Sequence, residues 1–122
     1  MKPSEIVIKY NASINQRDID KLASLIDDEY VFIDTAGTSI KGKHAGIETW
    51  RGFFEQFPDY KNEFEQIKEI DGNSVLVTGK SICNYEPLDG PALWRAKIKD
   101  GRLLEWQVYD DTDDNRTKLG IQ

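Results

Sequence analysis

The first half of the chain carries three segments in which apolar residues recur every three or four positions, the spacing of one helix face. The apolar positions are Ile6, Val7, Tyr10 and Ile14 in the first segment, Ile19, Leu22, Leu25 and Ile26 in the second, and Ile47, Trp50, Phe54 and Phe57 in the third. Ser4 and Asp18 suit the N-caps of the first two helices. Pro58 ends the third, because proline cannot donate a backbone hydrogen bond. The pattern therefore predicts three helices.

Strand patterns separate the second helix from the third and fill the second half of the chain. Residues 30–33 are β-branched or aromatic, and a short strand is expected within 35–43. From residue 60 onward the strand-length segments are 60–69, 74–85, 92–99 and 102–109. Asp100-Gly101 favours a two-residue hairpin, because a type I′ turn needs the positive φ that glycine adopts cheaply.

The last two predicted strands each have one apolar face, because side chains two positions apart point the same way. These faces consist of Trp94, Ala96 and Ile98 on one strand and Leu104, Trp106 and Val108 on the other. An element order of two helices, a strand, a helix and then hairpin-linked strands predicts an α+β domain. We expect one domain over residues 1–122, with a curved, mostly antiparallel sheet around the three helices and an opening at one end.

Composition narrows the function classes. The 122 residues carry a formal net charge of −6, which disfavours nucleic acid as a partner because that binding depends on Lys and Arg. No apolar run is long enough to span a bilayer, so we expect a cytoplasmic protein that does not enter membranes. Cys83 is the only cysteine and is expected to be a small buried residue.

The sequence offers no metal site. His44 is the only histidine, which excludes a two-histidine site, and it is expected to be exposed beside the start of the third helix. The acidic stretch 110–115 fits a calcium loop poorly, since Arg116 stands where the sharp turn needs glycine. We interpret this stretch as a solvated acidic turn, and we expect neither a metal nor a cofactor.

The first half of the sequence resembles bacterial ketosteroid isomerase, a member of the nuclear-transport-factor-two-like superfamily, whose fold is a cystatin-like α+β cone. The matching features are Lys9-Tyr10, the break at Arg17-Asp18-Ile19, the strand 30–34, Ala36-Gly37, Gly42 and the helix 47–54. The resemblance implies that Tyr10 occupies the position of the oxyanion donor and Asp34 that of the general base. The sequence departs from the family pattern at Trp94. This position corresponds to the family's second oxyanion donor, which is a carboxylic acid.

The end of the chain looks more like the SnoaL-like polyketide cyclases of the same superfamily. Tyr109-Asp110 is followed by Leu119-Gly120-Ile121, and Asp110 matches an aspartate that acts there as an acid and base. The resemblance also implies a homodimer formed through the outer face of the sheet, where Leu93 and Leu103 are expected. We thus expect a SnoaL-like domain.

Each candidate site residue also has a structural interpretation. Asp34 shares a strand face with Tyr30 and Phe32, which suits a partly desolvated base, but it could equally begin a turn and bond its own backbone. Tyr10 faces inward, which suits an oxyanion donor in a dry site or a core tyrosine bonded to the backbone.

Aromatic residues dominate the predicted interior, and most are expected to be core. The residues expected to line a pocket for an apolar small molecule are Phe32, Trp50, Phe54, Trp94 and Trp106. Two hypotheses follow for this pocket. The protein is an isomerase, cyclase or dehydratase acting on an apolar carbonyl compound through Asp34, Tyr10 and Asp110, or it is a ligand-binding or dimeric interaction module without catalysis.

Overall fold

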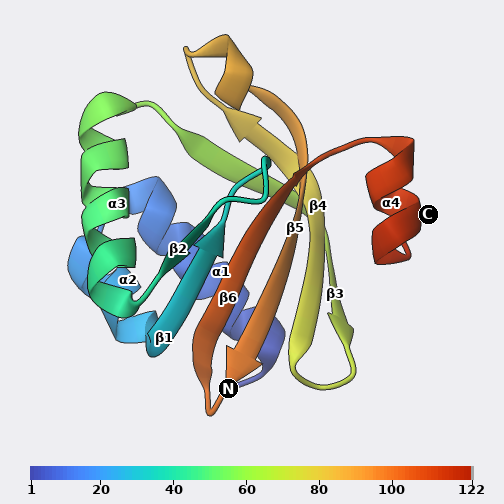
Figure 1. The fold of residues 1–122 in the computed structure, drawn as a ribbon, viewed down its shortest axis with the longest axis horizontal. Coiled ribbons are helices and arrows are strands. Elements are labelled where there is room, and N and C mark those ends of the chain that lie inside the picture. The colour runs from blue at the N-terminus through green and yellow to red at the C-terminus, as the bar shows by residue number, and fades with distance from the viewer. Residues whose placement is uncertain (122) are drawn as a thin grey trace.

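The computed structural model describes residues 1–121, in which N-terminal helices pack on a curved sheet in an α+β arrangement (Figure 1). The helices are α1 (Pro3–Gln16), α2 (Ile19–Leu25), α3 (Lys43–Gln56) and α4 (Asp113–Leu119), with a 3₁₀ turn, η1 (Glu86–Leu88). The strands are β1 (Ile26–Ile33), β2 (Ser39–Lys41), β3 (Lys61–Ile70), β4 (Ser74–Ile82), β5 (Gly90–Lys99) and β6 (Arg102–Asp110).

Within residues 1–121 the strands form one sheet in the order β2-β1-β6-β5-β4-β3. β1 and β6 run parallel, and the other neighbouring pairs are antiparallel. The helices α1, α2 and α3 lie together on one side of the sheet, while α4 lies at the opposite end, beside β3 and β4 (Figure 1). The predicted α+β class and mostly antiparallel sheet are confirmed.

The expected helix caps are right for α2 and wrong for α1. The Asp18 side chain accepts a hydrogen bond from the Lys21 amide at the start of α2. In α1 the N-cap position is Lys2, because Pro3 already has a helical φ and no amide hydrogen to satisfy. Ser4 instead donates from its amide and its hydroxyl to the Glu69 carboxylate, at 3.0 and 2.7 Å, which joins the start of α1 to the end of β3.

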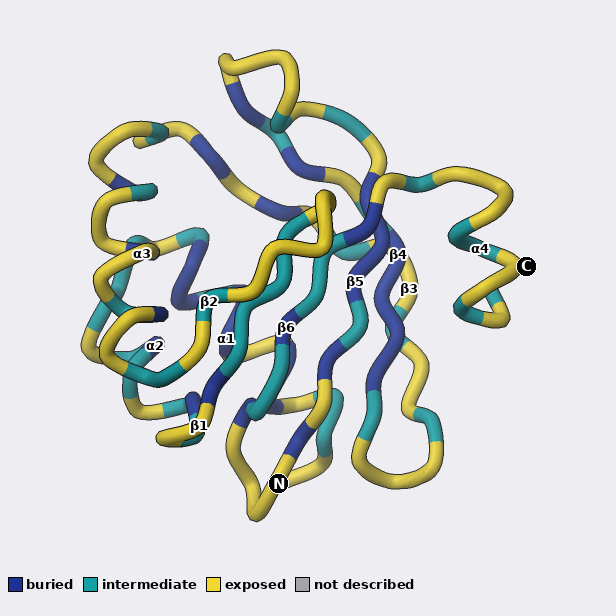
Figure 2. The backbone as a smooth tube through the Cα atoms, in the orientation of Figure 1, coloured by how far each residue is buried: buried dark blue, intermediate teal, exposed yellow. Residues whose placement is uncertain are grey.

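The core lies between α1 and the inner face of the sheet (Figure 2). The fully buried apolar residues of α1 are Ile6, Val7, Tyr10 and Ile14, and they pack in one cluster with Val75, Val77, Trp94, Ala96 and Trp106 of the sheet. The apolar face predicted for the first helix and the apolar faces predicted for the strands therefore pack against each other in one core.

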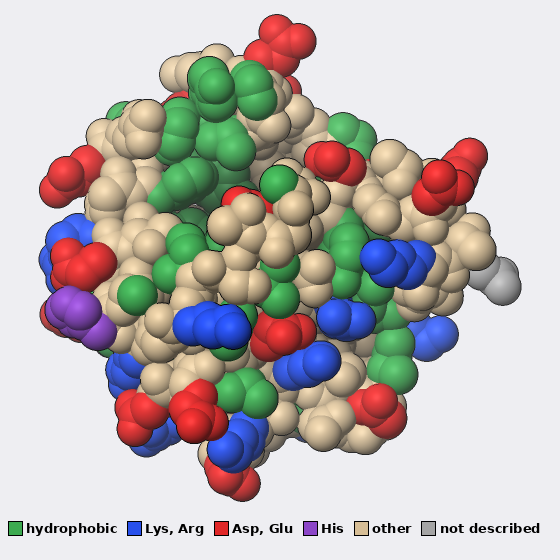
Figure 3. Space-filling view, in the orientation of Figure 1, with side chains coloured by type: hydrophobic (Ala, Val, Ile, Leu, Met, Phe, Trp, Pro, Cys, Tyr) green, Lys and Arg blue, Asp and Glu red, His purple; other side chains and the backbone are tan. Residues whose placement is uncertain are grey.

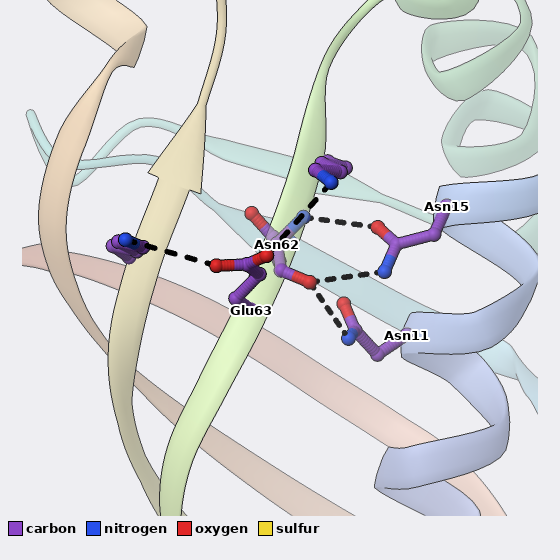
Figure 4. Close-up of polar contacts among 6 residues, drawn as sticks. Asn11, Asn15, Asn62 and Glu63 are labelled. Carbon is purple, nitrogen blue, oxygen red and sulfur yellow. Dashed lines mark hydrogen bonds and ion pairs between the residues drawn. The ribbon is translucent and has the colours of Figure 1, made fainter.

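Amide side chains of α1 also bind the edge strand β3 (Figure 4). The Asn15 side chain donates to the Asn62 carbonyl oxygen and accepts from the Asn62 amide, each at 2.9 Å. Asn11 donates to the same carbonyl oxygen at 3.3 Å. Since an edge strand has unpaired backbone groups, these contacts both satisfy β3 and fix α1 against it.

A β-bulge corrects the expected faces of β6. Ile98 pairs with Leu103 while Lys97 pairs with Glu105, so Leu104 is an extra residue without a partner on β5. Because a bulge shifts the alternation by one position, Leu103 joins the core cluster with Trp106. The expectation that Leu104 belongs to the inner face and Leu103 to the outer face is wrong. Leu93 does lie opposite Trp94, but it is fully buried.

The acidic end of the chain is a helix and not the solvated turn that we expected. The Thr112 hydroxyl caps α4 by accepting from the Asn115 amide at 3.1 Å. Asp113 and Asp114 occupy the first turn, where the helix dipole favours negative charge. Arg116 binds both carboxylate oxygens of Asp111, at 2.6 and 2.8 Å, and this hydrogen bonding lowers the pKa of Asp111.

Two further expectations concern single residues. Cys83 is buried, as expected, although it lies just beyond the end of β4. His44 is exposed in the first turn of α3, also as expected. In addition, no helix within residues 1–121 has both the length and the apolar character needed to cross a membrane.

Candidate functional site

An apolar cavity opens between α3, the ends of β1 and β6, and the η1 turn. In Figure 3 hydrophobic side chains gather around a hollow between α3 and the η1 loop. The cavity has a volume of about 180 Å³. We call it the aromatic cavity, and its lining residues are Phe32, Asp34, Thr35, Thr49, Trp50, Phe53, Tyr60, Leu88, Trp106 and Val108.

One wall of the aromatic cavity is a series of rings in edge-to-face contact. Phe32 and Trp50 lie 5.6 Å apart, Trp50 and Phe53 5.4 Å apart, and Phe53 and Tyr60 4.8 Å apart, all measured between ring centroids. The interplanar angles in this series are 85°, 79° and 90°. This geometry is favourable for aromatic pairs, so the wall is a packed apolar surface.

Asp34 is the one carboxylate among the described residues that line the aromatic cavity. Its Oδ1 atom accepts hydrogen bonds from the Ala36 and Thr38 amides, at 3.0 and 2.9 Å. The Oδ2 atom receives no hydrogen bond from residues 1–121. The turn that starts at Asp34 therefore orients the carboxylate, and one oxygen keeps its lone pairs available. The turn interpretation of Asp34 is confirmed, and its role as a base stays a prediction.

Tyr10 lies in the core, one layer behind the cavity wall. Its hydroxyl oxygen is 2.6 Å from that of Tyr30, and the Trp50 indole nitrogen donates to both oxygens, at 3.1 and 3.2 Å. The Tyr10 ring also lies 5.0 Å from that of Trp106. Tyr10 is thus in contact with two rings that line the aromatic cavity, without lining it itself.

Both tyrosines of this cluster are protonated at neutral pH. Burial raises the pKa of Tyr10 well above its ordinary value of 10.0, and the proximity of Tyr30 adds to the effect. Burial likewise raises the pKa of Tyr30 to about 12, although hydrogen bonds from its neighbours oppose the shift. Each hydroxyl is therefore a hydrogen-bond donor, as an oxyanion site would need.

A second, smaller hollow adjoins the aromatic cavity. It has a volume of about 120 Å³ and shares Thr35, Tyr60, Leu88 and Val108 with the cavity. We call it the polar recess, because its other lining residues include Ser81, Asp89 and Asp110. The polar recess is where the structure places Asp110, which is exposed and lies at the last position of β6.

The structure divides the five predicted pocket residues into two groups. Phe32, Trp50 and Trp106 line the aromatic cavity. Phe54 is buried against Trp50 in the core, and Trp94 is fully buried between Phe64 and Trp106. The Trp94 indole nitrogen has no hydrogen-bond partner among the described residues.

Several cavity residues were not anticipated from the sequence. Leu88 comes from the Pro- and Gly-rich segment between β4 and β5, and Tyr60 lies between α3 and β3, outside any periodic run. The available signals were an apolar residue within a polar connection, for Leu88, and an aromatic residue at the start of the predicted strand 60–69, for Tyr60. Within residues 1–121, no group of His, Cys, Asp or Glu side chains is arranged to hold a metal ion.

A comparison with family models identifies one family. The sequence model of the SnoaL-like domain matches residues 7–106. A search of curated proteins finds no match for this chain.

Solved structures resemble the chain over most of its length. A candidate polyketide cyclase from Sinorhizobium meliloti superposes with a TM-score of 0.76 at 23% identity, covering 85% of this chain and 93% of that protein. An NTF2-like protein of unknown function from Cytophaga hutchinsonii gives 0.76 at 13% identity, covering 98% and 96%. An LEH-like epoxide hydrolase from M. tuberculosis gives 0.77 at 19% identity, covering 89% and 78%. These likenesses confirm the expected nuclear-transport-factor-two-like fold.

Proposed function

The chain belongs to the SnoaL-like domain family, and on this basis we propose that it binds a small apolar carbonyl compound in the aromatic cavity and acts on it through Asp34. The reaction is an isomerisation, cyclisation or dehydration that starts by removal of a proton next to the carbonyl group. The observation that carries the proposal is the single carboxylate in a lining that is otherwise uncharged and consists mainly of aromatic and aliphatic residues.

The volume of the cavity supports a compound of about one ring. Pockets for drug-sized ligands measure about 300–1,000 Å³, whereas an apolar cavity of about 150 Å³ binds benzene. The aromatic cavity, at about 180 Å³, lies near the lower of these values. Its aromatic wall offers ring faces and edges against which a planar ring can pack.

The position of Asp34 supports its role as the base. Oδ2 takes the proton from the carbon beside the carbonyl, and the electron pair of that C–H bond forms an enolate. In an isomerisation the resulting carboxylic acid returns the proton to another carbon, so Asp34 ends as a carboxylate again. The Ala36 and Thr38 amides hold Oδ1 throughout, which keeps Oδ2 aimed without loss of side-chain entropy.

Tyr10 and Asp110 have supporting roles in this proposal. Tyr10 is the proposed oxyanion donor. Its hydroxyl lies behind Trp50 and bonds Tyr30 and Trp50, so this role requires the Trp50 ring to move aside and expose it. Asp110 is the proposed second acid and base, placed in the adjoining polar recess. The enolate oxygen would then lie toward Trp50, and the protonated leaving group toward the polar recess.

The alternative is a ligand-binding protein without catalysis. It is favoured by the closed hydrogen bonding of the Tyr10 cluster, since the Tyr10 and Tyr30 hydroxyls bond each other and the Trp50 indole inside the core. In this alternative the same cavity holds the same class of compound, and Asp34 serves the turn alone.

Hydrogen exchange on a simple ketone separates the two functions. Acetophenone is a suitable probe because it carries a single ring beside its carbonyl group. In deuterated water its methyl protons exchange for deuterium each time the enolate forms, and proton NMR measures the rate of this exchange. We expect the wild-type protein to accelerate this exchange, and Asp34→Asn to lower the acceleration on the order of 100-fold or more, the usual contribution of a general base.

Asparagine keeps the Oδ1 acceptor of the turn, so this variant tests the base without removing the fold. Asp20→Asn, at an exposed position of α2, is the matched control and should exchange like the wild type. Binding of acetophenone with no acceleration above buffer would favour the non-catalytic alternative, and equal rates for wild type and Asp34→Asn would remove Asp34 from the mechanism.

A further inference from the structure

The polar recess extends from the mouth of the aromatic cavity. The two hollows share Thr35, Tyr60, Leu88 and Val108, so they lie next to each other. A substituent on a ring bound in the aromatic cavity would therefore enter the polar recess. The chemistry of the recess then limits which substituents the ligand can carry, and this inference rests on the proposed function of the cavity.

Hydrogen bonds inside the recess leave the Tyr60 oxygen as an acceptor. The Ser81 hydroxyl donates its one proton to the Asn62 side-chain oxygen, at 2.7 Å. The Tyr60 hydroxyl lies 3.2 Å from the Ser81 oxygen, so in this pair Tyr60 must be the donor. Burial raises the pKa of Tyr60, so its hydroxyl keeps that proton. What Tyr60 presents to a ligand is the lone pairs of its oxygen.

The charged groups of the recess are acceptors only, whereas the Thr35 and Tyr109 hydroxyls in its lining can donate or accept. Asp89 and Asp110 line it, and no Lys or Arg is found among its described lining residues. The Asp89 carboxylate accepts from the Cys83 amide at 3.0 Å, which fixes its position. Tyr60 and Ser81 are each less than one-tenth exposed, whereas Asp89 and Asp110 are exposed, so the two hydroxyls are buried and the carboxylates lie at the surface of the recess.

We propose that the ligand is a single-ring carbonyl compound that carries a hydrogen-bond donor, such as a hydroxyl group, on the arm that enters the polar recess. A carboxylate or phosphate arm is excluded. Two carboxylates without a neighbouring Lys or Arg in the lining would repel an anion there. An apolar arm is disfavoured because it would desolvate the polar groups of the recess without supplying a hydrogen bond in return.

Three acetophenones that differ only in the para substituent test this selectivity. They carry a hydroxymethyl, an ethyl or a carboxylate group, and their binding is followed by quenching of the tryptophan fluorescence, since Trp50 and Trp106 line the cavity. We expect the hydroxymethyl compound to bind tightest and the carboxylate compound about tenfold more weakly or worse. A carboxylate compound that binds as tightly as the hydroxymethyl compound would overturn the proposal.

The Asp110→Asn variant tests whether the weaker binding of the carboxylate compound arises in the polar recess. We expect this variant to tighten binding of the carboxylate compound severalfold and to leave the ethyl compound unchanged. Asp113→Asn, on exposed α4, removes the same charge outside the recess and is the control. Equal effects of the two substitutions would show that net charge alone decides, and the proposed recess would be wrong.

The Asp34→Asn variant keeps this test separate from that of the proposed function. We expect Asp34→Asn to keep the ranking of the three compounds, because Asp34 does not line the polar recess. Selective binding without hydrogen exchange would overturn the proposed catalysis and leave the ligand class intact. Hydrogen exchange without selective binding would support the proposed catalysis and overturn the proposed ligand class.

Discussion

Three buried aromatic residues share their polar atoms directly behind the cavity wall. Tyr10, Tyr30 and Trp50 come from α1, β1 and α3, and the single indole proton of Trp50 is shared between the two hydroxyl oxygens. A buried hydroxyl without a partner costs free energy, so the three side chains stabilise one another only as a set. Because Trp50 also lines the cavity, its ring is held from behind.

Tyr10→Phe separates the structural role of Tyr10 from the proposed catalytic one. The substitution leaves Tyr30 and Trp50 bonded to each other, so we expect a loss of about 1–2 kcal/mol in the free energy of unfolding, measured with urea. The acetophenone exchange rate should fall much further in Tyr10→Phe than in Tyr30→Phe, the matched change on the other hydroxyl. Equal exchange rates in the two variants would assign Tyr10 to the core alone.

At the scale of residues, the sequence predicts whether a side chain faces the interior better than it predicts whether that side chain reaches the cavity. The spacing of α1 placed Tyr10 inward and in need of a partner, but that partner, Tyr30, is separated from it by 20 positions in the sequence. The same holds for the predicted pocket residues. Trp94 and Trp106 both face inward, yet only Trp106 reaches the cavity, since depth depends on neighbours from other strands.

At the scale of elements, α3 lies close to β1 because Gly46 has no side chain. A Cβ atom at Gly46 would lie 2.6 Å from two ring atoms of Tyr30, which is inside their contact distance. Gly52, on the same helix, would place a Cβ atom in open space, with nothing within 4 Å. A side chain at Gly46 would therefore collide with Tyr30, whereas a side chain at Gly52 would meet no neighbour.

These two glycines make a matched pair of alanine substitutions. We expect Gly46→Ala to lower the free energy of unfolding by about 1–3 kcal/mol, because the ring of Tyr30 must shift and the cluster behind the cavity shifts with it. Gly52→Ala should raise the free energy of unfolding by about 0.5–1 kcal/mol, because alanine loses less backbone entropy in a helix. Urea unfolding measures both, and a Gly46→Ala protein as stable as Gly52→Ala would contradict the close contact.

The elements that the sequence missed are those without a periodic signal. The bulge at Leu104 depends on the register between two strands, which the alternation of one strand does not contain. α4 is a helix of seven residues with no buried residue, so it shows no apolar stripe to detect. Its cap at Thr112 and its acidic first turn were the available indications, and we interpreted them as a turn.

At the scale of the whole molecule, the aromatic cavity is made by elements that are distant in the sequence. Its lining comes from α3, from β1 and β6, and from the η1 turn. β1 and β6 pair in parallel although they lie at opposite ends of the sheet-forming sequence, and no local pattern specifies that pairing. The homodimer expected from the family resemblance stays a prediction. Leu103 no longer supports it, because Leu103 lies in the core.

The buried tyrosines make the stability of the whole protein sensitive to alkaline pH. The pKa of Tyr30 is raised from 10.0 to about 12, so between these values the unfolded chain loses a proton that the folded protein keeps. The stabilisation is therefore fully present below about pH 10 and is lost as the pH rises toward 12. Each such tyrosine should lower the free energy of unfolding by about 1.4 kcal/mol per pH unit in this range.

Urea unfolding at a series of pH values should give a shallower loss of stability for Tyr30→Phe than for the wild type. Tyr85→Phe, which changes a tyrosine that is 53% exposed, should follow the wild type. Equal slopes for Tyr30→Phe and the wild type would contradict the burial of the Tyr30 hydroxyl, and with it the cluster that supports the cavity wall.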